Sequence, residues 1–157
     1  FQDSITNEFW YRIGAENAAA FFAYRYGIAV SHGGLLAKMR DLARFGLLYT
    51  PSYPVVSDTQ IISDEHLDLI FNGGNPQLLR NAGFPEDGPY RHNTYMWKEV
   101  FKNGFLKHGG WGGQGLIIHP EKDVVAVFTS YVKQDYSEVS LDAAVMKVLE
   151  KTFLDTE

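Results

Sequence analysis

The chain has 157 residues, of which 45% are hydrophobic and 21% are charged, a balance typical of a folded domain. Its net charge of -5, from 14 basic and 19 acidic residues, argues against a surface that binds nucleic-acid phosphates. There is no cysteine, so disulfides and thiolate metal sites are excluded, and no apolar stretch approaches the roughly 18 residues of a membrane span. We expect a single domain over residues 1–157, while the cellular compartment stays open.

The first 93 residues are predicted to be helices and loops. Residues 9–13 have amphipathic spacing. From Leu35 to Tyr49 apolar residues recur at helical intervals, which predicts one helix with Asp41 on its polar face. Asp41 and Arg44 are expected to tie this helix to its neighbours.

A second helix is expected after the capping residues Ser63 or Asp64, and it would bury Leu67, Ile70 and Phe71. Residues 72–93 contain four glycines and three prolines. We therefore expect an irregular segment there that shapes the rim of a binding site.

The part from 94 to 157 is predicted to be an antiparallel meander followed by a helix. Strands are expected at 94–101, 105–108, 115–119 and 124–130, with turns between them, and an amphipathic helix from about Ser137 onward. The predicted fold class is α+β, an α/β/α sandwich in which helices flank an antiparallel sheet.

The stretch "HGGWGGQG" at residues 108–115 places five glycines around Trp111, between two predicted strands. Glycine inside a sheet packs poorly and is entropically costly, so a cluster marks a bulge, a loose turn or a close approach of ligand to backbone.

Two stretches together suggest a family. The helix "GGLLAKMRDLARFGLLY" (33–49) and the segment from Lys107 to Phe128 resemble the serine β-lactamase-like superfamily. That superfamily includes class C β-lactamases, penicillin-binding carboxypeptidases, esterases and 6-aminohexanoate-dimer hydrolases. The resemblance implies the C-terminal part of a β-lactamase/transpeptidase-like fold and acyl transfer through a serine ester, with a small-molecule ester or amide as substrate.

The resemblance also implies roles for particular residues. His108-Gly109-Gly110 would be the third active-site motif, with His108 where many relatives have lysine. The backbone N–H of Trp111 would donate to the oxyanion, and Gly109 and Gly110 would let substrate lie against the strand. Tyr95 could contact the acyl portion. Because Gly109 lacks the hydroxyl that β-lactam-binding relatives carry, we expect an esterase, amidase or peptidase-like hydrolase rather than an efficient β-lactamase.

The other two motifs of the superfamily are missing. Ser130–Lys133 spells Ser-x-x-Lys, but it follows a strand instead of beginning a helix, and Tyr90–Asn93 does not have Tyr-x-Asn spacing. We expect both motifs upstream of Phe1. The chain alone would then be inactive and would associate with an N-terminal segment as a second chain, or form a homo-oligomer.

Two other hypotheses remain open. The chain could be a non-catalytic binding module with the same fold, in which His108 merely bonds to a loop carbonyl. A metal hydrolase using His92, His108 and His119 is disfavoured, because these histidines match no helical metal spacing. We expect neither a cofactor nor a metal.

Overall fold

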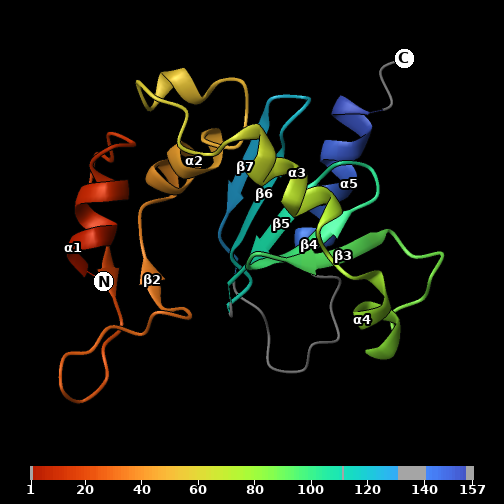
Figure 1. The fold of residues 1–157 in the computed structure, drawn as a ribbon, viewed down its shortest axis with the longest axis horizontal. Coiled ribbons are helices and arrows are strands. Elements are labelled where there is room, and N and C mark those ends of the chain that lie inside the picture. The colour runs from red at the N-terminus through yellow and green to blue at the C-terminus, as the bar shows by residue number, and fades with distance from the viewer. Residues whose placement is uncertain (1, 111, 131–140, 155–157) are drawn as a thin grey trace.

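A computed structural model describes residues 2–110, 112–130 and 141–154 of the chain. The centre of the molecule is a five-stranded antiparallel sheet with the strand order β3-β4-β5-β6-β7 (Figure 1). The strands follow one another in sequence, so each neighbouring pair is joined by a short connection. They are β3 (Tyr90–Thr94), β4 (Trp97–Phe101), β5 (Leu106–Gly109), β6 (Gly115–His119) and β7 (Val124–Phe128).

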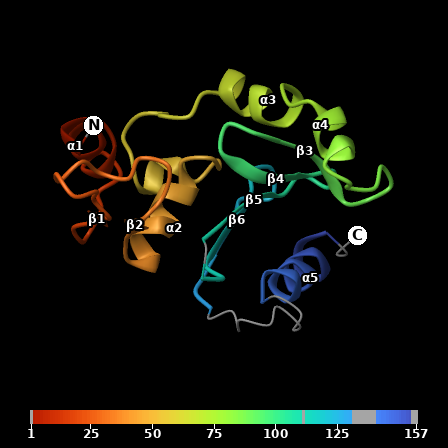
Figure 2. The same ribbon diagram turned by 90° about the horizontal axis from the view of Figure 1, so that it is seen from below.

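Helices cover both faces of this sheet, which confirms the α+β fold class (Figure 2). Helices α2 (Met39–Leu47) and α3 (Asp64–Asn72) lie against one face, and α5 (Leu141–Phe153) lies against the other. Alternating strand residues therefore supply two separate apolar clusters, one beneath each helical layer.

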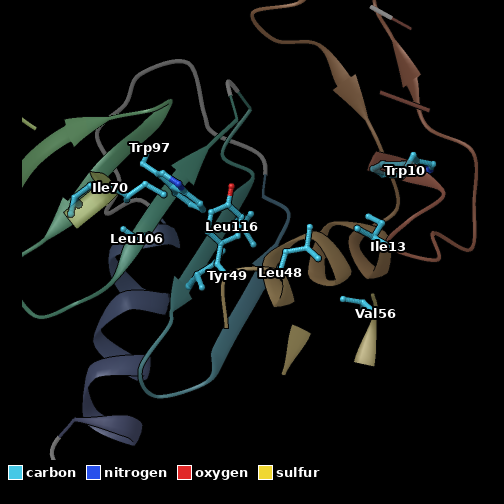
Figure 3. Close-up of a cluster of buried hydrophobic side chains, with 11 residues drawn as sticks. Trp10, Ile13, Leu48, Tyr49, Val56, Ile70, Trp97, Leu106 and Leu116 are labelled. Atoms are coloured by element: carbon cyan, nitrogen blue, oxygen red, sulfur yellow. The ribbon is translucent and has the colours of Figure 1, made fainter. Parts of the chain in front are cut away.

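The larger cluster joins the helical half of the chain to the sheet (Figure 3). Tyr49, at the end of α2, packs edge-on against Trp97 of β4 with 5.2 Å between ring centroids. Burial raises the pKa of Tyr49 to about 12, because the phenolate would lose its hydration there. Further fully buried members come from well-separated segments: Ile13, Ile70, Val100, Leu106 and Ile118.

The N-terminal segment contains α1 (Gln2–Ile5), a π-helical turn at Thr6–Trp10, and the two-stranded ribbon of β1 (Ala20–Phe21) and β2 (Leu35–Leu36). The prediction of one helix from Leu35 to Tyr49 is thus wrong at its beginning. Leu35 and Leu36 pair with β1, and α2 begins only at Met39.

Asp41 is not on an exposed polar face as predicted, because its side chain is fully buried. Its carboxylate accepts hydrogen bonds from the Glu16 backbone N–H (2.7 Å) and the Asn17 amide (3.2 Å). Arg44, one turn further along α2, donates from Nε to the Ile13 carbonyl at 2.8 Å. These bonds confirm that Asp41 and Arg44 tie the helix to its neighbours.

The middle of the chain is more regular than the sequence predicts. The expected cap of α3 is confirmed, since Ser63 Oγ accepts a bond from the His66 N–H. The segment 72–93, expected to be irregular, contains helix α4 (Pro76–Asn81) and most of β3. A short 3-10 turn at Tyr53–Val55 precedes α3.

The predicted strand 94–101 contains a hairpin turn. Thr94 pairs with Trp97, so Tyr95 and Met96 form a two-residue turn between β3 and β4. Both turn residues have positive φ, 45° and 68°. Neither is a residue type that favours this conformation, which explains why the sequence does not reveal the turn.

The remaining strands agree with the predictions to within one or two residues, and the final helix is described over Leu141–Phe153, while its predicted start near Ser137 lies outside the described residues. The β5–β6 and β6–β7 pairs are in regular register, and Asp123 closes the second turn with a φ of 56°. Helix α5 buries Met146 and Leu149 against the sheet, while Val148 stays exposed. No helix within the described residues is both long and apolar enough to cross a membrane.

Candidate active site

The residues predicted to form the third motif, His108, Gly109 and Gly110, lie where β5 ends, at one end of the sheet. His108 pairs with Leu116 and Gly109 with Gly115 across the β5–β6 ladder. Gly115 in turn pairs with Phe128 of β7. The end of β5 is therefore held by a regular ladder, which gives the backbone of the motif a fixed position.

Successive side chains of β5 point to opposite faces of the sheet, so His108 and Lys107 lie on different faces. Leu106 belongs to the cluster beneath α2 and α3, so His108 shares that face, whereas Lys107 points to the α5 face. There the Lys107 ammonium bonds to Glu99 at 2.8 Å and to Asp142 of α5. Burial alone would lower the pKa of Lys107, but the bonds to Asp142 and Glu99 outweigh it and raise the pKa.

His108 has a depressed pKa. Partial loss of hydration lowers the pKa of its imidazole, and the positive charge of Lys98 lowers it further. Continuing the Glu99–Lys107 register by one residue places Lys98 opposite His108, in agreement with this electrostatic effect. At neutral pH the imidazole is therefore uncharged, so it can hold a hydrogen bond or accept a proton.

The glycine-rich connection between β5 and β6 is organised by Gln114. The Gly110 N–H donates to the Gln114 backbone carbonyl at 2.8 Å, and the Gln114 side chain accepts from the Gly112 N–H at 2.9 Å. A Cβ at Gly110 would lie 2.5 Å from Gln114 Oε1. Gly113 has a φ of 87°, which a residue with a side chain rarely adopts. The described glycines at 110, 112 and 113 are therefore held in a defined backbone conformation around Gln114.

Gly109 differs from the glycines around it. Among the described residues, a Cβ there would meet only the Gln114 carbonyl, at an ordinary contact distance of 3.6 Å, whereas a Cβ at Gly115 would overlap the ring of Phe128. The folded chain therefore requires glycine at 115 for packing but not at 109. The space that the described residues leave open at Gly109 is consistent with a ligand approaching the strand at that point.

This difference predicts unequal effects of the same substitution. Gly109→Ser should leave the free energy of unfolding unchanged within about 0.5 kcal/mol, because the new side chain enters open space. Gly115→Ser should destabilise the fold by about 1–3 kcal/mol, because Phe128 would have to move. Chemical denaturation of the two variants beside the parent measures both values, and a loss at position 109 as large as that at 115 would contradict the assignment.

The other predicted site residues are placed as follows. Tyr95, in the β3–β4 turn, has 53% of its surface exposed, and its ring contacts the His66 ring of α3 with centroids 5.2 Å apart. Trp111 lies outside the described residues, so the oxyanion role of its N–H stays a prediction. Ser130 lies two residues after the end of β7, and residues 131–133 of the Ser-x-x-Lys match also lie outside the described part.

The three histidines of the metal hypothesis do not form a site. His92 is buried and bonds through Nε2 to the Ile70 carbonyl at 2.8 Å, and His119 bonds to the Asn103 carbonyl at 3.1 Å. Throughout the described ranges, no three His, Cys, Asp or Glu side chains are grouped to hold a metal ion.

Two surface hollows lie away from the motif. One of about 360 Å³ borders Asn103 and the last turns of α5. The other, of about 210 Å³, lies between α4 and β3. Neither of these two hollows is lined by the described residues of the segment 108–115.

Comparison with known proteins relates the chain to a hydrolase. It is 23% identical over 128 residues to a 6-aminohexanoate-dimer hydrolase from Paenarthrobacter ureafaciens. The aligned part covers 81% of this chain and 32% of that enzyme, so the chain spans about a third of the length of the curated relative it matches. No family model matches the chain.

Proposed function

We propose that these residues form the third-motif part of a serine hydrolase that cleaves a small-molecule ester or amide by acyl transfer. The observation that carries the proposal is the end of β5, where His108 is followed by Gly109, a glycine that no packing in the described chain requires. The similarity to a hydrolase of the matching superfamily supports the same assignment.

The proposed chemistry assigns one task to each part of the motif. A serine hydroxyl supplied by residues outside this chain adds to the substrate carbonyl carbon, and the carbonyl oxygen becomes an oxyanion. The Trp111 N–H donates a hydrogen bond to that oxygen when substrate lies along Gly109, whereas the Gln114 side chain occupies the corresponding space at Gly110. The alcohol or amine then leaves with a proton, and water hydrolyses the acyl-enzyme to release the acid.

His108 in its neutral form supplies a hydrogen bond to the proton network of the nucleophile. The depressed pKa of His108 favours this role over that of a fixed positive charge. The nearby Lys98 offers a positive charge beside the same strand end.

A fluorophosphonate probe tests the proposal, because it reacts covalently with an activated serine. We expect the full-length protein that contains these residues to be labelled at one serine outside Phe1–Glu157, and the 157-residue chain alone to stay unlabelled. Peptide mapping identifies the labelled position. Absence of labelling in the full-length protein would favour the non-catalytic binding module.

A further inference from the structure

The turn between β3 and β4 is energetically unfavourable. Tyr95 and Met96 both adopt the left-handed region, with φ of 45° and 68°. A two-residue hairpin turn of this kind favours Asn-Gly or Asp-Gly, because at positive φ a Cβ crowds the following carbonyl oxygen. Glycine has no Cβ, and the short side chains of Asn and Asp form local hydrogen bonds that offset the cost. Two large residues in succession make this turn less stable than the same hairpin with ordinary turn residues.

The strain is not compensated by burial of the two side chains. Tyr95 is 53% exposed and Met96 is 70% exposed. Tyr95 makes one ring contact, with His66, which holds the aromatic ring against α3. Met96 has no place in either apolar cluster. The sequence therefore presents a tyrosine and a methionine at a strained position where they contribute little to the core.

The turn lies at the end of the sheet that carries the third motif (Figure 1). Trp97 begins β4 directly after the turn and belongs to the same apolar cluster as Leu116, the residue that pairs with His108 across the β5–β6 ladder. Strained residues that persist without a packing benefit are found most often at functional sites.

We propose that Tyr95 and Met96 determine substrate specificity by contacting the acyl chain of the substrate. The proposal rests on the hydrolase function proposed above and adds a substrate class to it, an ester or amide with a flexible, uncharged aliphatic acyl chain. Methionine adapts to such chains because its side chain is unbranched and polarizable. The exposed tyrosine ring, steadied by His66, supplies a flat apolar wall beside it.

The test replaces the turn with a better turn sequence, in the double variant Tyr95→Asn/Met96→Gly of the full-length protein. We expect its melting temperature to rise by about 3–6 °C, because the strain is relieved. The ratio of kcat/KM for p-nitrophenyl hexanoate to that for p-nitrophenyl acetate should fall about tenfold, because acetate is too short to reach the turn.

The exposed apolar residue Val148 provides a matched control on the opposite face of the sheet, since Val148→Ala should change neither the melting temperature nor the ratio. A double variant with an unchanged ratio overturns the specificity role, whatever its melting temperature. An unchanged melting temperature overturns the strain argument. Failure of the parent protein to hydrolyse either ester overturns the proposed function itself, and the specificity role with it.

Discussion

Replacing His108 by alanine is expected to lower kcat/KM of the full-length protein by about 100-fold or more. A side chain that donates or accepts a proton in the transition state contributes at least this much in most enzymes. His108 is placed for such a role, because it is at the end of β5 and on the opposite face from the ion pairs of Lys107. Its loss should leave stability nearly unchanged, because the residue is exposed.

His119 is the matched control for this experiment. It belongs to the neighbouring strand β6 but lies at the far end of the sheet, buried against Phe105 with 4.7 Å between ring centroids. The variant His119→Gln should lower the melting temperature while kcat/KM of the folded enzyme stays unchanged. Full activity of His108→Ala would instead show that His108 is an ordinary strand-end histidine.

The pH dependence gives an independent readout of the same role. The pKa of His108 lies below its ordinary value of 6.5, so the neutral form persists to lower pH in the folded protein. Activity should therefore be constant near pH 7 and fall only as the pH drops through this depressed pKa. Because the unfolded chain binds the proton first, protonation of His108 also reduces stability below about pH 6.5. Loss of the acidic limb in His108→Gln would confirm that this residue titrates.

Periodicity and turn residues predicted the sheet well where local preferences agree with the tertiary structure. The segments 105–108, 115–119 and 124–130 are rich in apolar and β-branched residues and are separated by recognisable turns, and the strands found there, β5, β6 and β7, match them to within one or two residues. The helix cap at Ser63 was also predicted from the sequence, because a serine directly before an apolar helical pattern can accept a hydrogen bond from a backbone N–H of the first turn, here that of His66.

Sequence reasoning failed where tertiary contacts override local pattern. Leu35 and Leu36 continue the helical spacing of α2, but pairing with β1 holds them as a strand. The hairpin turn at Tyr95 and Met96 was not predicted, because neither residue type favours the positive φ that both adopt. No local pattern could reveal this turn, because it depends on the ladder between β3 and β4.

The candidate site was predictable only in part, because its details also depend on tertiary contacts. The glycine cluster at 108–115 indicated a special backbone, but it did not distinguish Gly109, which packing leaves unconstrained, from Gly115, which Phe128 requires. The effect of Lys98 on His108 depends on strand register, which single-sequence patterns do not provide.

Asp41→Ala is expected to cause the largest loss of stability among these substitutions, about 2–4 kcal/mol. The wild-type carboxylate is fully buried and accepts bonds from the Glu16 N–H and the Asn17 amide. Alanine would leave these donors without their acceptor and would open a small void, and each effect is costly in a buried position. Urea denaturation of the parent and the variant measures the difference.

Asp68 allows the burial effect to be separated from the effect of removing an aspartate from a helix. It lies on α3, is exposed, and accepts one bond from Asn72 four residues later. Asp68→Ala should cost less than about 0.5 kcal/mol, because water replaces that bond. Equal losses for the two variants would mean that the links from Asp41 to Glu16 and Asn17 do not stabilise the fold. A much larger loss at Asp41 would show that the N-terminal segment is held on α2 by a buried carboxylate, at a position that helical periodicity marks as exposed.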